Sequence, residues 1–324
     1  MNIPEVKESY GGKINNVFIG ATAAEGGTRS KVVKIGGHTT VPFLGYEGLT
    51  FPPAIAFEVP DLPPEPGEWP DVLVEPYKDV LHDPVAWAKK CAEEYGADLI
   101  CIRLLSIHPD RGNVSAAKAK ELVLKIRDAV KVPLVIWGCD DDPRDNEVLP
   151  VISQALAGEK CLFGMASQDN YKTLVASCLA DGHSLLGLSP IDINIAKQVN
   201  ILVSDMGLPA DRIVMYPTTG ALGYGMEYTY SIMERGRLAA LAGDKMLAMP
   251  VFCVVGPESW KAKEAKAAET EFPQWGSATE RGILWEAVTA TALLQAGADI
   301  LLMRHPKAVE IARATLRDLM AAKA

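Results

Sequence analysis

Several local signatures of metal and nucleotide binding are missing from this 324-residue sequence. Its six cysteines include no CxxC pair or other close cluster, and this spacing argues against a sequence-local zinc or iron–sulfur site. Its five histidines include no HExxH pair, and no glycine-rich segment has the GxxxxGK(S/T) or GxGxxG spacing of a phosphate-binding loop. The sequence therefore contains no local motif for a metal of its own.

A positive charge excess and a membrane-length apolar run are also missing. The formal net charge is -9, and an acidic surface repels phosphate backbones, so we expect no nucleic-acid partner. No apolar run reaches the roughly 18 residues of a membrane helix. The first residues, MNIPEVKESYGGK, lack the basic-then-apolar pattern of a secretory signal. We therefore expect a cytoplasmic protein whose cysteines are free thiols that pack in the core.

Residues 1–53 differ in pattern from the rest of the chain. Glycine pairs at 11–12, 26–27 and 36–37 separate short β-branched runs such as 17–19 and 31–35. This pattern predicts a short N-terminal β-hairpin extension, packed as a cap on the domain that follows. The proline-rich segment 60–70 is incompatible with a helix or a central strand, so we expect a loop there.

From residue 54 to 324, short apolar runs alternate with amphipathic stretches. The eight apolar runs are 54–59, 99–105, 134–139, 161–166, 184–188, 213–216, 250–255 and 299–303. They are almost unalternated, as strands buried on both faces are. The stretches with helical spacing are 84–95, 116–130, 145–156, 170–179, 192–206, 228–241, 278–294 and 307–322. Eight successive βα units predict an α/β fold, a (β/α)8 TIM barrel over 54–324.

Two features refine this barrel. Glycine follows three predicted helices, in Tyr-Gly-Ala-Asp98, Ala-Asp-Gly182 and Ala-Gly-Ala-Asp299, where it supplies the left-handed conformation that ends a helix. The segment 261–269 is strongly helical in composition, but Phe272-Pro-Gln-Trp-Gly276 breaks it. We expect a solvated insertion at the barrel mouth there.

In such barrels the functional face is built from the loops after the strands. The run Asp140-Asp141-Asp142 follows the third strand and is open to two interpretations. Clustered carboxylates can bind a cation or a polar ligand, but acids before a proline are also typical of a helix N-terminus. The same choice applies to Asp169-Asn170, where capping is favoured.

His108 and His305 each precede a proline and are expected to be hydrogen-bonded loop residues.

The loop after the sixth strand is the strongest candidate for ligand contact. Its small residues let backbone approach a ligand closely, and an aromatic and a methionine add adaptable apolar contact. This composition suits a large, flat, amide-bearing ligand or a protein surface, although a plain glycine-rich turn explains it equally well. The candidate binding residues are Thr218, Thr219, Gly220, Leu222, Gly223, Tyr224, Gly225 and Met226. No catalytic or metal-binding residue is assigned.

Several strand phrases resemble those of one protein family. They are Ala-Asp-Leu-Ile-Cys-Ile-Arg103, Pro133-Leu-Val-Ile-Trp-Gly-Cys139, Met215-Tyr-Pro-Thr-Thr-Gly-Ala-Leu-Gly-Tyr-Gly225, Pro250-Val-Phe-Cys-Val-Val-Gly-Pro-Glu-Ser-Trp260 and Gly282-Ile-Leu-Trp-Glu286. Through them the chain resembles the small subunit of the corrinoid iron–sulfur protein, which is related to the delta subunit of acetyl-CoA decarbonylase/synthase. The resemblance runs from the proline-rich segment to the last strand.

This resemblance implies a barrel that pairs with a large subunit as a heterodimer. The large subunit would hold the [4Fe–4S] cluster and a mobile domain that carries the corrinoid (cobalamin), and this chain would share in covering the corrinoid. The pair would take a methyl group from methyltetrahydrofolate methyltransferase and deliver it to acetyl-CoA synthase in the reductive acetyl-CoA (Wood–Ljungdahl) pathway. The resemblance implies a carrier subunit that is not an enzyme on its own.

Two other functions remain open at this point. The first is a pterin-type barrel methyltransferase that acts on methyltetrahydrofolate, with Asp140, Asp141, Asp169 and Asn170 recognising the pterin; the second is a purely structural dimerisation barrel. Asp181-Gly-His183 comes close to the Asp-x-His-x-x-Gly pattern of a cobalt ligand, but its glycine is one place late and it lies at the other barrel end, so we interpret it as a turn. Trp69, Trp260 and Trp275, in loop-like segments, are expected to be exposed anchors for the partner.

Overall fold

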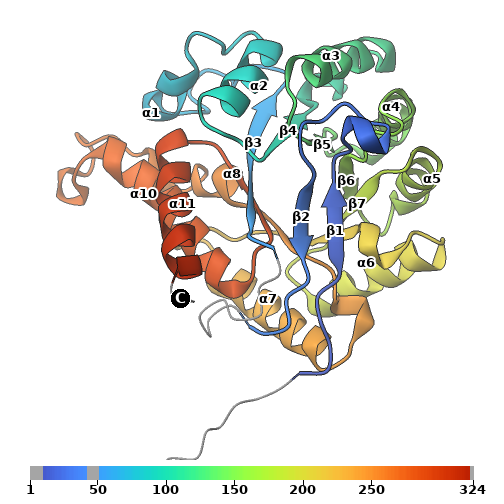
Figure 1. The fold of residues 1–324 in the computed structure, drawn as a ribbon. Helices are drawn as coiled ribbons and strands as arrows, with labels where there is room; N and C mark the ends of the chain where they lie inside the picture. The colour runs from blue at the N-terminus through green and yellow to red at the C-terminus, as the bar shows by residue number, and fades with distance from the viewer. Residues whose placement is uncertain (1–9, 42–50, 322–324) are drawn as a thin grey trace, which may run out of the picture.

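The predicted barrel is confirmed by a computed structural model, which describes residues 10–41 and 51–321 (Figure 1). Eight parallel strands lie in the order β8-β7-β6-β5-β4-β3-β10-β9, and a bridge between Met215 and Val251 joins the two ends of this order. The strands are β3 (Ala54–Pro60), β4 (Leu99–Arg103), β5 (Leu134–Trp137), β6 (Leu162–Ala166), β7 (Ser184–Leu188), β8 (Ile213–Tyr216), β9 (Phe252–Val254) and β10 (Ile300–Met303). Each lies within one residue of a predicted run or inside it.

The helices form a ring around these strands (Figure 1). The long ones are α2 (Pro84–Glu93), α3 (Ala116–Ala129), α4 (Asp142–Ala155), α5 (Tyr171–Asp181), α6 (Ile193–Asp205), α7 (Met226–Leu241), α10 (Ala278–Ala296) and α11 (Pro306–Ala321). Gly182 and Gly297 end α5 and α10 with φ of 83° and 107°, which confirms the predicted glycine stops. The short helices α1 (Asp71–Val74), α8 (Val255–Ser259) and α9 (Lys263–Lys266) lie in the loops.

The insertion after β9 is less helical than its composition predicts. Only Lys263–Lys266 form a helix in the segment 261–269. Arg281 of α10 explains the early end, because its Nε donates to the Glu264 carbonyl at 2.5 Å and its side chain also donates to the carbonyl of Ala267. The Arg281 side chain thus takes the place of the backbone N–H groups that these carbonyls would bond if the helix continued.

Alternating strand residues divide the core into two parts. Side chains such as Ala56, Cys101 and Leu302 fill the barrel interior, whereas Phe57, Ile102 and Leu301 pack outward against the helices. All six cysteines are buried free thiols; burial was expected for the four inside apolar runs, Cys101, Cys139, Cys161 and Cys253, and Cys91 and Cys178 are buried as well. Within the described ranges, no helix is long and apolar enough to cross a membrane.

The hairpin of β1 (Asn16–Ile19) and β2 (Val33–Gly36) covers the amino-terminal end of the barrel, and in Figure 1 it lies across the ring of strands. Val17, Ile19, Val33 and Ile35 belong to the same apolar cluster as the barrel interior. The chain around the hairpin bonds to the loops that precede three strands. Asn15 N–H donates to Ala248 at 2.7 Å, Gly20 N–H to Lys160 at 2.7 Å and Ser30 N–H to Lys131 at 2.8 Å. The barrel is thus closed at one end, and the mouth lies at the other.

A buried ion pair holds the hairpin segment in place. The Arg29 side chain, fully buried, donates to Glu159 at 3.0 Å and to the Val130 carbonyl at 2.8 Å. Glu159 also accepts from the Thr28 hydroxyl at 2.7 Å. A charge removed from water in this way depends on its partner, because an unpaired buried charge costs several kcal/mol.

We therefore expect Glu159→Gln to lower the free energy of unfolding by about 3 kcal/mol, because it leaves the Arg29 guanidinium buried without its counter-ion. Urea denaturation of the purified chain measures the change. The matched control is Glu121→Gln, which breaks an exposed pair with Lys125 and should change stability by less than about 0.5 kcal/mol. Equal losses in both variants would show that the pair does not hold the hairpin.

Candidate functional site

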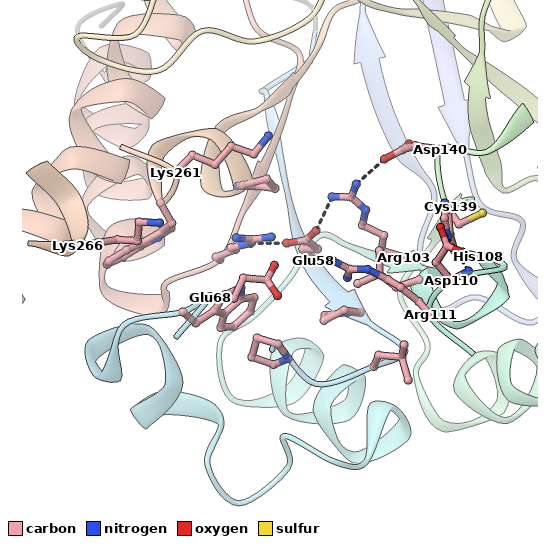
Figure 2. Close-up of a pocket in the computed structure, with 18 residues that line it drawn as sticks. Glu58, Glu68, Arg103, His108, Asp110, Arg111, Cys139, Asp140, Lys261 and Lys266 are labelled. Atoms are coloured by element: carbon pink, nitrogen blue, oxygen red, sulfur yellow. Dashed lines mark hydrogen bonds and ion pairs between the residues drawn. The ribbon is translucent and has the colours of Figure 1, made fainter. Parts of the chain in front are cut away.

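A cavity of about 500 Å³ opens at the carboxyl ends of β3, β4, β5 and β10 (Figure 2). Its volume lies within the range of small-molecule pockets. Charged side chains from several loops and strands converge on it. They are Glu58, Glu68, Arg103, Asp110, Arg111, Asp140, Lys261, Lys266 and Arg304. Apolar side chains, among them Pro60, Trp69 and Trp260, complete the walls.

The floor of the cavity is a buried carboxylate between two arginines. Glu58, on β3, is 2% exposed. It accepts from Arg103 Nη1 at 3.3 Å, as Figure 2 shows, and from Arg304 Nε. Burial raises the pKa of Glu58, but the charges of Arg304 and Arg103 outweigh this effect, so its pKa lies below the usual range. Glu58 is therefore ionised, and it fixes both guanidinium groups.

Aromatic rings and a second acid orient these arginines further. The Arg103 guanidinium lies 4.6 Å from the centroid of the Trp137 ring and donates to Asp140 at 2.6 Å. The Arg304 guanidinium lies 4.7 Å from the Trp69 ring. A guanidinium stacked on an indole loses rotational freedom and gains a cation–π attraction. Both arginines are thus held in set orientations before any ligand arrives.

A second buried carboxylate, Glu286 on α10, holds the wall behind this floor. It accepts from the indole N–H of Trp260 at 2.6 Å, the backbone N–H of Arg304 at 2.6 Å and that of His305 at 3.1 Å. Burial raises the pKa of Glu286 to about 7, although these hydrogen bonds lower it in part. The close packing requires Gly282, because a Cβ there would lie 2.6 Å from the Trp260 ring.

The three aspartates that follow β5 have three different roles. Asp140 pairs with Arg103 and accepts from the Trp137 indole at 2.8 Å. Asp141 caps α4, since its side chain accepts from Arg144 N–H at 2.9 Å, which confirms the predicted helix N-terminus. Asp142 accepts from the side-chain amide of Asn170 at 2.8 Å. In the described part of the chain, no group of three His, Cys, Asp or Glu could hold a metal ion.

The capping prediction was wrong for Asn170. It occupies the N-cap position of α5, but its side chain makes no bond to the helix. Instead Asn170 accepts from Ser167 N–H at 2.8 Å, within the turn before the helix, and donates to Asp142. Both the oxygen and the nitrogen of the Asn170 side chain are therefore hydrogen-bonded elsewhere and do not cap α5.

The histidines are hydrogen-bonded structural residues, as expected. His108 accepts from Asp110 N–H at 3.1 Å and lines the cavity. His305 is buried, lies 3.2 Å from the Val72 carbonyl, and has its pKa lowered to about 4 by burial. His183 is fully buried and accepts from Cys161 N–H at 3.1 Å at the start of β7. His183 therefore lies at the closed end of the barrel, away from the mouth.

The loop after β8, Thr218 to Met226, lies outside this cavity. Its polar groups are bonded within the protein: Thr219 accepts from Val254 N–H at 2.8 Å, Gly220 N–H donates to Thr229 at 2.7 Å, and Leu222 N–H donates to Thr289 at 3.2 Å. Thr218 donates to the Ser189 carbonyl at 2.7 Å. These bonds hold the loop in one conformation. The loop can therefore contact a ligand through its shape, because these polar groups are already hydrogen-bonded.

The outer part of the same loop is exposed. Gly223 and Tyr224 face solvent, with Tyr224 51% exposed, and Gly225 and Met226 are half-buried at the start of α7. The Tyr224 hydroxyl bonds Glu264 of α9 at 2.9 Å. Leu222 lines a separate shallow groove with Trp275, Leu284 and Trp285. The loop thus joins the insertion after β9 to a largely apolar rim.

Two of the three tryptophans expected at the surface are buried. Trp69 is 6% and Trp260 is 2% exposed, so this prediction was wrong for both. Trp69 packs edge-on against Trp87 with ring centroids 5.7 Å apart, and Trp260 is held by Glu286. Trp275 is half-buried and stacks on Phe272. The loops that carry these side chains fold back onto the barrel instead of standing free.

The sequence interpretation missed Glu58 and the two arginines that it binds. A usable signal was present, since Glu58 is the one acid in the apolar strand Ala-Ile-Ala-Phe-Glu-Val-Pro60 and Arg103 ends the apolar strand Leu-Ile-Cys-Ile-Arg103. Charges inside strands that are buried on both faces require partners or a functional role.

Comparison with known proteins identifies the family. Residues 16–318 match the family model of the CO dehydrogenase/acetyl-CoA synthase delta subunit. The chain belongs to this delta-subunit family. The delta subunit of the acetyl-CoA decarbonylase/synthase complex of Methanopyrus kandleri is 39% identical over 93% of this chain and 74% of its own length. The delta subunit from Archaeoglobus fulgidus is 34% identical over 97% of this chain and 70% of its own length.

Solved structures similar to this delta-family chain show the fold alone. Dihydropteroate synthase from Stenotrophomonas maltophilia aligns with a TM-score of 0.56 at 15% identity, over 84% of this chain and 94% of that one. The enzyme from Xanthomonas albilineans aligns with a TM-score of 0.55 at 15% identity and the same coverage. Both agree with the closed α/β barrel described above.

The raised pKa of Glu286 predicts a pH-dependent stability. A carboxyl whose pKa is about 7 in the folded state and ordinary in the unfolded state binds its proton more tightly when folded. Glu286 should therefore lower stability as pH rises between the two pKa values, by up to about 1.4 kcal/mol per pH unit. Other buried groups, among them Asp145 and His305, also titrate in this range, so the effect of Glu286 is measured as a difference. The stability of the wild type minus that of Glu286→Gln should fall by up to this amount per pH unit between pH 5 and 7, as urea denaturation at pH 5, 6, 7 and 8 would measure.

The control for this prediction is Glu280→Gln, on the exposed side of the same helix. It should leave the slope between pH 5 and 7 unchanged. If Glu286→Gln and the wild type have equal slopes, Glu286 does not contribute to the pH dependence of stability. Because the slope is compared within each variant, a uniform loss of stability in Glu286→Gln does not affect the result.

Proposed function

We propose that this delta-family chain is the non-catalytic small subunit of a heterodimeric corrinoid iron–sulfur methyl carrier. The carrier accepts a methyl group from methyltetrahydrofolate methyltransferase and delivers it to acetyl-CoA synthase in the cytoplasm. The observation that carries the proposal is the match to delta subunits along nearly the whole chain, 93% of it for the 39%-identical relative. In this function the barrel mouth covers the corrinoid that the large subunit binds, and the large subunit holds the [4Fe–4S] cluster.

The shape of the mouth supports this covering role. The corrinoid supplies the cobalt centre that accepts and releases the methyl group. This chain contributes the rigid loop after β8, in which Gly223 is exposed with a φ of +74° and lets the backbone approach a flat ligand closely. Tyr224 and Met226 add apolar surface beside it. Exclusion of water by such a surface protects a reactive centre from side reactions.

The arrangement of the acids gives less support to a pterin-dependent methyltransferase. Asp140 is bonded to Arg103 and Trp137, Asp141 caps α4, and Asn170 is bonded to Asp142. Three of the four side chains proposed to recognise a pterin ring are thus already used by their neighbours, and the fourth, Asp169, is exposed. Their partners hold the loops in place, which leaves the carrier as the better-supported function.

The carrier function predicts that Gly223→Val weakens the cover without unfolding the barrel. A β-branched side chain on the exposed loop keeps the loop from approaching the corrinoid, and it also disfavours the positive φ at this position. In the reconstituted heterodimer, we expect Co(I) to be lost to oxidation several-fold faster, as followed by absorbance under limiting oxygen. The rate of methyl transfer to acetyl-CoA synthase should fall as well.

Gly207→Val is the matched control for Gly223→Val. Gly207 has a similar φ of +93° and open space around it, but it lies before β8, at the closed end of the barrel. It therefore imposes the same backbone strain far from the mouth. If both variants lose Co(I) at the wild-type rate, the loop is only a turn. Saturable binding and turnover of methyltetrahydrofolate by this chain with a separate corrinoid acceptor would instead favour the methyltransferase.

The partner function predicts an apolar surface for the large subunit. Leu284 and Val288 on α10 are 50% and 43% exposed, and Tyr228 on α7 is 65% exposed beside the loop after β8. Leu284 and Val288 line a groove with Leu222, and Tyr228 lies beside Gly225, so exposed apolar side chains flank the loop after β8. Such exposed apolar areas are typical of protein interfaces, where a few buried anchors dominate the binding energy.

We expect Leu284→Arg to weaken binding of the large subunit by about 2 kcal/mol, or roughly thirtyfold, because it places a charge in the buried centre of the contact. Analytical ultracentrifugation of the two purified subunits measures the affinity. The control is Leu179→Arg on α5, where Leu179 is 38% exposed on the opposite side of the barrel (Figure 1). Equal affinities for Leu284→Arg and the wild type would place the partner elsewhere.

A further inference from the structure

We propose that the 500 Å³ cavity binds a small organic dianion, a free molecule with two carboxylate or phosphate groups joined by an apolar body. This site is distinct from the loop after β8 and does not depend on corrinoid binding. The proposal therefore goes beyond the carrier function, and it remains valid if that function is wrong. It rests on the charge, the unused hydrogen-bond donors and the walls of the cavity.

The charge of the cavity is opposite to that of the chain. Five cationic and four anionic side chains line it, whereas the whole chain carries a formal net charge of -9. The acids at the floor are already used, because Glu58 binds both arginines and Asp140 binds Arg103. Glu68 accepts from Glu65 N–H at 3.0 Å. Asp110, which is exposed at the rim, lies 4.0 Å from His108 Nδ1 and is followed by the cation Arg111. The cavity therefore favours anions.

The unused donors lie on three sides of the cavity. Arg304 uses its Nε for Glu58, and its two terminal nitrogens make no hydrogen bond to any of the described residues. The side chains of Arg111 and Lys266 likewise form no ion pair in residues 10–41 or 51–321. In Figure 2, Lys266 and Arg111 lie on opposite sides, with Glu58 and Arg103 between them. One anionic group can reach the floor, and a second can reach the rim.

The Arg304 group is suited to a carboxylate or a phosphate. A guanidinium presents parallel N–H groups that bind two oxygens at once, and such charge-assisted bonds are about twice as strong as neutral ones. Its stacking on Trp69 fixes its orientation in advance. Glu58 and Asp140 balance the charges of the two arginines, so the floor offers oriented N–H donors, and the positive excess of the cavity comes from Arg111, Lys261 and Lys266.

The walls explain why the ligand is organic rather than a bare ion. Trp69, Trp260, Pro60 and Leu105 line the cavity between its charged groups. A cavity of about 500 Å³ is far larger than a phosphate ion and matches the lower half of the range for small-molecule sites. The apolar surface is available to the body that joins the two anionic groups.

The test is isothermal titration calorimetry of the purified full chain with succinate and with butyrate. These acids have the same carbon chain, and only succinate carries a second carboxylate. We expect saturable binding of succinate at one site, with butyrate about tenfold weaker or worse because it lacks one charge-assisted contact. Raising the KCl concentration should lower the affinity for succinate, because salt screens exposed cations. Inorganic phosphate should compete with succinate.

Variants at the rim locate the site. Arg111→Gln with Lys266→Gln removes two exposed cations that no described acid pairs with, so the barrel should keep its stability. We expect succinate affinity to fall about tenfold or more. The matched control is Lys118→Gln with Lys172→Gln, which removes the same charge from exposed positions on α3 and α5. An equal fall in succinate affinity in both double variants would show that only the net charge of the chain matters, and would contradict a site in the cavity.

Two other results would also overturn the proposal. The first is no saturable binding of succinate or phosphate at millimolar concentration to a chain that unfolds cooperatively. The second is binding that the isolated chain shows and the heterodimer loses, because the cavity would then receive an acidic group of the partner and not a free molecule. Unchanged Co(I) protection in Gly223→Val, together with saturable succinate binding, would contradict the carrier function alone, so the two proposals fail separately.

Discussion

The mouth of this barrel depends on one buried carboxylate, Glu58. It is ionised and lies between two arginines from β4 and from the end of β10, and so it joins strands on both of its sides. Removing one partner from a buried ion pair of this kind costs about 3–5 kcal/mol, because the remaining charge has no water. The same arrangement that stabilises the strands also orients Arg103 and Arg304. Stability and ligand recognition therefore rest on the same three side chains.

The closed end of the barrel determines where these charges can lie. The hairpin adds Val17, Ile19, Val33 and Ile35 to the apolar interior, so a charged side chain pointing into the barrel at that end would be surrounded by apolar groups. The charged residues within β3 to β10 are Glu58 and Arg103, and they lie in the last layer, where strands end and loops supply counter-ions. Glu58 occupies this layer, and Glu286 holds the wall behind it through Trp260 and the backbone of Arg304. The charged floor of the cavity and the apolar side chains of the hairpin thus lie at opposite ends of one packed barrel interior.

The strands and helices could be predicted because their signals are local. Unalternated apolar runs such as 184–188 and 213–216 coincide with strands, and glycines end α5 and α10 as expected. The floor of the cavity could not be predicted in this way, since Glu58 pairs with residues 45 and 246 positions away in sequence. The loop after β8 shows the opposite difficulty. Its glycines and threonines suggested ligand contact, but Thr219 and Gly220 are used to anchor the turn. Composition alone does not separate a residue that meets a ligand from one that shapes the loop.

The mouth divides into two regions with different chemistry. On one side, Tyr228, Leu284 and Val288 expose apolar surface around the loop after β8. On the other, the cavity presents cations suited to small charged groups. The short helix α9 connects them, because its Glu264 bonds the Tyr224 hydroxyl and its Lys266 lines the cavity two residues later. Arg281 anchors this helix to α10, so α9 cannot move independently of the rim. The partner of the Tyr224 hydroxyl and the cation at the edge of the cavity thus lie on the same short helix, so α9 fixes where the apolar and the charged regions of the mouth meet.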